Sequence, residues 1–99
     1  MYISVSDLRF NTKTLELRRG QKTINLTKQE LKLLHLLLVH KNTPVSRGEI
    51  LEHIWHASVN MKTRIVDVYI GYLRKKIDHG FEKQLIKSVR GKGYTISED

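Results

Sequence analysis

The residues between Arg64 and Ile77 have the types and spacing of a helix with two different faces. At 100° per residue, one stripe collects apolar side chains, as a helix lying on a core requires: Val66, Tyr69, Ile70, Leu73 and Ile77. The opposite side collects two cations, a glycine and three apolar or aromatic residues: Arg64, Ile65, Val68, Gly71, Tyr72 and Lys75. A solvated helix face normally mixes Glu with Lys, but this one contains no acid. The pattern therefore predicts that the outer face contacts a partner.

The outer side chains suit the major groove of DNA, which admits one α-helix. The two cations can contact phosphate or guanine, and Ile65 and Val68 can meet thymine methyl groups. Tyr72 can do either, while Gly71 lets the backbone approach closely. The alternative is that the cations only form a solvated face, as on many basic helices. The missing acids and a second cationic segment nearby favour contact.

Positive charge is concentrated around this segment. Lys plus Arg number 18 against 10 for Asp plus Glu, which gives a net charge of +8 and a pI near 9.9. Residues 62–92 hold nine Lys and Arg against three acids, a surplus of six. This balance favours a polyanion, either nucleic acid or an anionic membrane surface. We expect no membrane partner, because the cationic face has too little apolar content for an interfacial anchor.

The composition excludes several other classes of function. The chain has no cysteine, so it cannot form disulfides or thiolate zinc sites. The strongly apolar run 33–39 is far too short to span a bilayer, and residues 1–11 alternate like a strand, unlike a signal peptide. We therefore expect a cytoplasmic protein.

No catalytic or metal-binding group of residues can be assembled. His53 and His56 could share a helix face, but no third ligand follows at a matching spacing. No nucleophile lies beside a base and an orienting group, since Glu30 and Glu49 are expected to cap helices. We expect no enzyme, no metal and no cofactor.

The elements that would hold the outer face begin with a small sheet. Residues 2–26 alternate apolar and polar types between turn-forming tripeptides, which predicts an antiparallel meander. Its strands are expected at residues 2–6, 8–10, 15–17 and 23–26. So short a sheet needs a helix packed on one face.

Three helices are expected next, at about 27–41, 46–56 and 63–78. Thr27 with Glu30 and Ser46 with Glu49 have the spacing of capping boxes, and Thr63 could cap the third helix. Pro44 limits the first helix, and Gly80 suits the left-handed position after the third. A hairpin at 85–97, turning at Arg90-Gly91-Lys92-Gly93, completes a single α+β domain of residues 1–99. The second and third helices form a plausible helix-turn-helix.

Several motifs occur in a characteristic order along the chain. They are Leu26-Thr27-x-x-Glu30-x-x-Leu33-Leu34, Ser46-Arg47, Trp55, Arg64-x-Val66-Asp67-Val68-x-Ile70, Leu73-Arg74-x-Lys76 and Val89-Arg90-Gly91-x-Gly93-Tyr94. Together they resemble the OmpR/PhoB-type winged-helix DNA-binding domain, the output half of two-component response regulators. The resemblance covers nearly the whole chain. It implies a four-stranded N-terminal antiparallel sheet, three helices and a C-terminal hairpin that acts as the wing.

The resemblance also implies functional roles. The third helix would enter the major groove with Arg64, Val68 and Tyr72, and Arg90 of the wing would reach the minor groove. Further DNA contacts would come from Trp55 and the Tyr94 hydroxyl, both at phosphates. Apart from the resemblance, the cations Lys87 and Lys92 of the hairpin are themselves candidates for phosphate contacts. The connector 56–62 matches a loop that touches RNA polymerase in several members, with the candidate residues His56, Ser58, Asn60 and Lys62.

The implied partners are double-stranded DNA in direct-repeat half-sites, a second copy bound head to tail, and a receiver domain in the full-length protein. Many members carry a basic or amide side chain where this chain has Gly71 or Tyr72, so an inherited target sequence is not expected. A different class of function stays open. Ile65, Val68 and Tyr72 could fit a groove on another protein, which would make the domain an interaction module with only non-specific DNA affinity.

Overall fold

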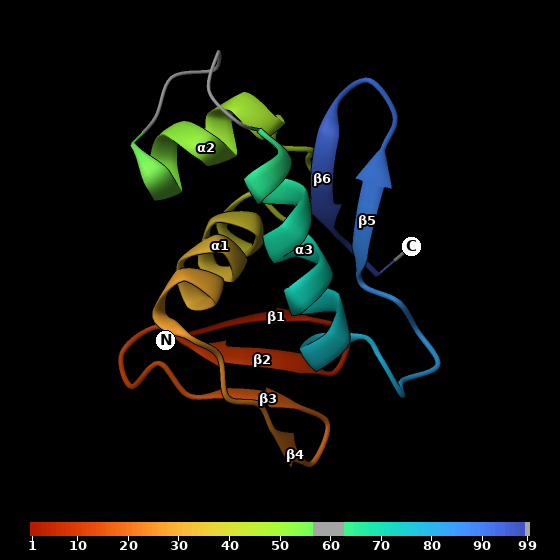
Figure 1. Cartoon of the computed structure of the whole chain (residues 1–99). Coiled ribbons are helices and arrows are strands. Elements are labelled where there is room, and N and C mark those ends of the chain that lie inside the picture. Colours follow the sequence, from red (N-terminus) through yellow and green to blue (C-terminus); the bar gives the residue numbers. More distant parts are fainter. Residues whose placement is uncertain (57–62, 99) are drawn as a thin grey trace.

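The computed structural model describes residues 1–56 and 63–98 (Figure 1). Along the chain it contains β1 (Tyr2–Val5), β2 (Leu8–Asn11), β3 (Leu17–Arg19), β4 (Lys22–Thr23), α1 (Lys28–Val39), α2 (Arg47–Trp55), α3 (Arg64–Ile77), β5 (Ile86–Val89) and β6 (Gly93–Ile96). A four-stranded antiparallel sheet, three helices and a C-terminal hairpin follow one another as the sequence predicts, so the predicted fold class is confirmed.

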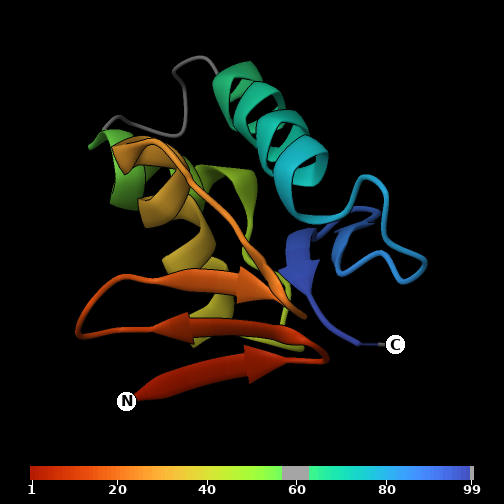
Figure 2. The ribbon, with the colours of Figure 1, turned by 90° about the horizontal axis from the view of Figure 1, so that it is seen from below.

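The N-terminal sheet has the strand order β1-β2-β3-β4, and every neighbouring pair is antiparallel. One face buries Val5, Leu8, Phe10 and Leu17. Figure 2 shows the strands along one edge of the molecule, with the helices on one side of them. The helices therefore cover one face of the sheet, which is the packing that so short a sheet needs for stability.

Two of the predicted strand positions are wrong. The Asn11 side chain accepts hydrogen bonds from the amides of Lys13 and Thr14, which draws the chain into a turn. Leu15 then has a left-handed φ of 66° and is 52% exposed, so β3 begins only at Leu17. The strand expected at 23–26 is β4, which ends at Thr23 before the chain leads into α1.

α1 is the central helix. Thr27 and Glu30 form the predicted capping box, with the Thr27 hydroxyl accepting from the Glu30 amide and the Glu30 carboxylate accepting from the Thr27 amide. Leu33, Leu34 and Leu37 are fully buried. The helix packs against α2, α3, β1 and β6. Among the described residues, no helix is long and apolar enough to cross a membrane.

The other two predicted caps are only partly correct. Ser46 caps α2 by accepting from the Glu49 amide, but the Glu49 carboxylate accepts from the Ser46 hydroxyl and not from its amide. Within the described residues, the Thr63 side chain makes no capping hydrogen bond. Its backbone is already helical, with φ −62° and ψ −15°, whereas an N-cap needs an extended backbone.

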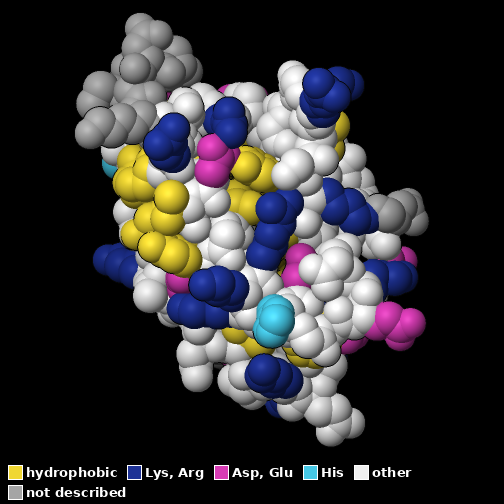
Figure 3. All heavy atoms as spheres, turned by 45° about the vertical axis from the view of Figure 1, so that its right-hand side comes forward, with side chains coloured by type: hydrophobic (Ala, Val, Ile, Leu, Met, Phe, Trp, Pro, Cys, Tyr) yellow, Lys and Arg dark blue, Asp and Glu magenta, His cyan; other side chains and the backbone are white. Residues whose placement is uncertain are grey.

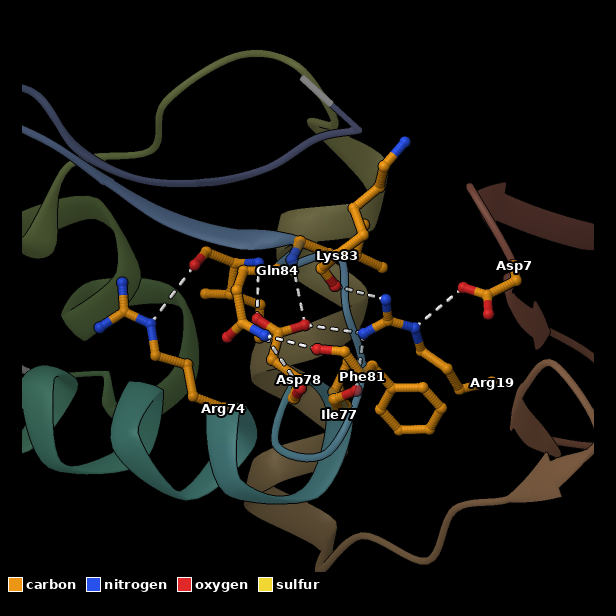
Figure 4. Close-up of polar contacts among 10 residues, drawn as sticks. Asp7, Arg19, Arg74, Ile77, Asp78, Phe81, Lys83 and Gln84 are labelled. Carbon is orange, nitrogen blue, oxygen red and sulfur yellow. Dashed lines mark hydrogen bonds and ion pairs between the residues drawn. The ribbon is translucent and has the colours of Figure 1, made fainter.

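A buried arginine on β3 connects the sheet to the end of α3, a contact that no local sequence pattern predicts (Figure 4). Arg19 is 2% exposed. Its guanidinium donates to Asp78 Oδ1 at 2.9 Å, to the Ile77 carbonyl at 2.7 Å and to Asp7 Oδ1 at 2.9 Å, and also to the Lys83 carbonyl. A buried charge is tolerable only when it is paired and its donors are satisfied, as here.

Asp78 also connects the end of α3 to the hairpin. Its two carboxylate oxygens accept from the amides of Leu85 and Ile86, each at 3.0 Å. Gly80 lies between, with a left-handed φ of 87°, as predicted for the residue that follows the last turn of α3. The C-terminal end of α3 and the start of β5 are thus fixed to one carboxylate.

The hairpin is also anchored to the segment between α1 and α2. Val45 exchanges backbone hydrogen bonds with Tyr94 at 2.8 and 3.0 Å. Gly93 lies against this segment with φ of 133°, and a Cβ added there would be 2.0 Å from the Val45 carbonyl oxygen. Only glycine allows this approach of the two backbones.

Candidate nucleic-acid interface

The two predicted faces of α3 are separated as expected. Val66, Ile70, Leu73 and Ile77 are completely buried. On the opposite side Arg64 and Lys75 are exposed, Val68 and Tyr72 are 43% and 45% exposed, and Ile65 and Gly71 are half-buried. α3 therefore presents two cations and a half-exposed apolar strip to a partner.

Aromatic side chains join this strip to α2. Tyr69, predicted to lie in the buried stripe, is only partly buried. Its ring lies edge-on to Trp55 at 5.1 Å and to Tyr72 at 5.3 Å between centroids. Trp55 is itself partly buried against the core, so packing is one role that the structure gives it. Its predicted phosphate contact stays a prediction.

The hairpin turn carries the second group of cations. Arg90 and Lys92 are exposed, and Lys87 is half-buried. Between this turn and the start of α2 lies a hollow of about 480 Å³, lined by Ser46, Arg47 and residues 88–94. Figure 3 shows Lys and Arg side chains spread over the face that carries α3 and the hairpin, with few acids between them.

Two cations of α3 are committed to the fold. Arg74 donates to the Ile86 carbonyl and to the Ser88 hydroxyl of β5. Lys76 pairs with Glu30 of α1 at 2.6 Å. These two residues therefore position α3, and Arg64 and Lys75 are the cations of this helix that face outward.

Asp67, the acid on α3, joins three elements. Arg47 of α2 donates from Nε to Oδ1 at 2.9 Å and from Nη2 to Oδ2 at 2.6 Å. The Tyr94 hydroxyl of β6 also donates to Oδ1. Arg47 reaches Asp67 because the start of α2 packs beside the first turn of α3.

The charges of this group depend on one another. Its hydrogen bonds to Asp67 raise the pKa of Arg47 above its usual value. Burial raises the pKa of the Tyr94 hydroxyl, and the hydrogen bond to Asp67 raises it further. Both shifts favour the protonated forms, a guanidinium on Arg47 and a neutral phenol on Tyr94.

This arrangement bears on the predicted role of Tyr94. The residue is 8% exposed, and the one proton of its hydroxyl goes to Asp67. A phosphate offers only acceptors, so a phosphate contact through this hydroxyl would require the hydrogen bond to Asp67 to break. The structure gives Tyr94 a connecting role that the sequence did not reveal.

The connector can be compared with the prediction at one residue. His56 is the C-cap of α2, with a left-handed φ of 54°. Ser58, Asn60 and Lys62 lie outside the described residues. Among the residues that the structure describes, no group of three His, Cys, Asp or Glu could hold a metal ion.

A helix-turn-helix framed by a sheet and a hairpin defines a winged helix. Residues 20–96 match the family described as "Transcriptional regulatory protein, C terminal". The chain belongs to this family of OmpR/PhoB-type DNA-binding domains, which are effector domains of transcription regulators and not enzymes. The family resemblance read from the ordered motifs is thereby confirmed.

Curated relatives include the transcriptional regulatory protein YkoG of Bacillus subtilis, which is 45% identical over 95 residues, 96% of this chain and 42% of that protein. The response regulator MprA of Mycobacterium leprae is 38% identical over 97% of this chain and 42% of its own length. The chain thus spans less than half the length of these relatives.

Among solved structures, the DNA-binding domain of RstA from Klebsiella pneumoniae, in complex with the RstA box, has a TM-score of 0.88 and 28% identity, over 99% of this chain and 98% of that one. The DNA-binding domain of CpxR from Escherichia coli has a TM-score of 0.84 and 26% identity, over 100% and 99%.

Proposed function

We propose that this domain binds double-stranded DNA sequence-specifically to regulate transcription, as the effector part of a response regulator. The observation that carries the proposal is the acid-poor outer face of α3 beside the cationic turn of the hairpin. α3 would enter the major groove and the hairpin turn the adjacent minor groove. A related domain solved in complex with its DNA box supports DNA as the partner.

The outer face of α3 and the wing would both contact the DNA. Arg64 and Lys75 would contact phosphate or guanine, and Ile65, Val68 and Tyr72 would meet base edges with Gly71 bringing the backbone close. Arg90 would enter the minor groove, whose negative potential rises where it is narrow. Lys87 and Lys92 would contact phosphates, and Trp55 would approach one from α2.

The partners of the full-length protein belong to the same proposal. Relatives that are named response regulators and are more than twice as long support a receiver domain outside this segment. We further propose two copies bound head to tail on direct repeats, RNA polymerase as the partner of the connector 56–62, and a cytoplasmic location.

A second function has one observation in its favour. Val68 and Tyr72 are large apolar side chains that remain 43% and 45% exposed. They could fit an apolar groove on a protein as well as thymine methyl groups. The domain would then bind all duplexes weakly and alike.

A competition titration distinguishes the two functions. Duplexes that the domain retains from a random pool are sequenced, and one of them competes with its scrambled version at moderate salt. Sequence-specific regulation predicts much stronger displacement by the selected duplex, whereas equal displacement favours the interaction module.

Arg90→Ala tests the role of the wing in the same titration. If Arg90 enters a groove, its removal should weaken binding of the selected duplex by about 1–3 kcal/mol. Lys92→Ala is the matched control on the same turn. It should lower the salt dependence of binding without changing the preferred sequence. Unchanged affinity and footprint for Arg90→Ala would show that the wing is wrongly assigned.

A further inference from the structure

Asp67 is an acid in the first turn of the helix that is proposed to enter DNA. The positive end of the helix dipole favours a carboxylate there. A negative charge nevertheless opposes phosphate binding, and its side chain is still 31% exposed. We therefore expect Asp67 to have a function whose benefit exceeds the repulsion between its carboxylate and DNA phosphates.

The geometry of its hydrogen bonds indicates that function. Arg47 is held by two parallel bonds, an arrangement that fixes orientation as well as distance. Tyr94 reaches the same carboxylate from β6, four residues after Arg90. Through Asp67, the first turn of α3 is thus connected to the start of α2 and to the base of the wing.

We propose that Asp67 is a positioning residue for DNA recognition, which holds the reading helix and the wing in the one relative placement that fits two adjacent grooves. The proposal rests on the proposed function. Asp67 itself need not touch DNA. Its contribution is preorganisation, since elements that are already correctly placed lose less conformational freedom on binding.

Three explanations of Asp67 predict different outcomes for Asp67→Asn. If it acted only through charge, its removal would strengthen binding to every duplex, because repulsion of phosphates would be lost. If it only held the fold together, its removal would weaken binding to every duplex by the same factor. Positioning predicts a fall in affinity for the selected duplex, with affinity for its scrambled version unchanged or raised.

The test measures both dissociation constants for the wild type, Asp67→Asn, Tyr94→Phe and Glu16→Gln. Tyr94→Phe removes only the hydroxyl and keeps both bonds from Arg47. Glu16→Gln makes the same change of charge on the exposed loop before β3, far along the chain from α3. Thermal unfolding of each variant is followed in parallel.

We expect the ratio of selected to scrambled affinity to fall about tenfold for Asp67→Asn and less, in the same direction, for Tyr94→Phe. Glu16→Gln should leave it unchanged. Equal factors on both duplexes, in either direction, would overturn the positioning role. If Asp67→Asn does not fold, Tyr94→Phe decides by the same ratio. A wild type without any preference would overturn the proposed function, and this proposal with it.

Discussion

Glu30 lies at the first turn of α1 and is nearly buried. Its Oε1 accepts from the Thr27 amide at 2.8 Å and from Lys76 Nζ at 2.6 Å. Burial raises the pKa of this carboxyl, but the hydrogen bonds from Lys76 and Thr27 outweigh it, so the pKa lies below its ordinary value of 4.5. The charged form is therefore favoured in the folded protein.

The sign of this shift predicts how acid affects stability. A carboxyl with a depressed pKa stabilises the fold above its ordinary value, and that stability is lost as the pH falls through the folded-state pKa. We expect the free energy of unfolding to decrease below about pH 4.5. Glu30→Gln should lose this component and be about 1–2 kcal/mol less stable at pH 7.

Urea unfolding between pH 3 and pH 7, roughly the range in which carboxyls titrate, measures the difference. Glu52→Gln on the exposed side of α2 is the matched control and should follow the wild type. An acid dependence that is identical in Glu30→Gln and the wild type would show that Glu30 does not carry the effect.

Sequence predicted one half of this residue's role and not the other. The Thr27-x-x-Glu30 spacing reveals a cap because its partners are local. Lys76 follows 46 residues later, and only the packing of α1 against α3 brings it close. For the same reason, the sequence does not reveal that Arg47 pairs with Asp67 or that Asp78 pairs with Arg19. Each of these pairs depends on tertiary packing, which no local pattern contains.

α3 and the wing each contain a glycine, Gly71 and Gly93, and the fold requires only the second. Within the described structure, a Cβ added at Gly71 would meet no heavy atom within 4 Å. The fold therefore does not require this glycine. At Gly93 the added Cβ would clash with the Val45 backbone at a φ of 133°.

Alanine at the two positions should therefore change stability in opposite directions. Gly71→Ala should stabilise the domain by about 0.5–1 kcal/mol, the usual gain of Ala over Gly inside a helix, but weaken binding of the selected duplex if the backbone approaches DNA there. Gly93→Ala should destabilise the domain by about 1–3 kcal/mol.

Urea denaturation and DNA titration of both variants check this pair of outcomes. A less stable Gly71→Ala would contradict the open surface at this position. A more stable variant with undiminished affinity would contradict close approach of DNA to α3.

Elements were predictable where their signals are short-range. The inner and outer faces of α3 follow from helical periodicity, and the hairpin from two glycines between β-branched segments. The start of β3 at Leu17 instead of Leu15 was not predictable, because the Asn11 side chain accepts hydrogen bonds from two amides and overrides an alternation that looks like a strand.

In the whole molecule, side-chain contacts anchor both ends of the helix that carries the candidate interface. Arg19 and Asp78 fix the C-terminal end of α3 to the sheet and to β5, while Arg47, Asp67 and Tyr94 fix its first turn to α2 and β6. The order of elements could be predicted from the sequence, because the cap, turn and periodicity signals of each element lie within its own segment. The contacts that anchor the two ends of α3 could not be predicted, since they join residues from distant segments.

DNA binding through α3 and the wing is tested by following backbone amide signals by nuclear magnetic resonance while the selected duplex is added. The largest shifts are expected on residues 64–75 of α3 and 90–93 of the wing, with strands β1 to β4 nearly unchanged. Shifts centred on the sheet or on α1, with α3 undisturbed, would show that DNA binds elsewhere on the domain.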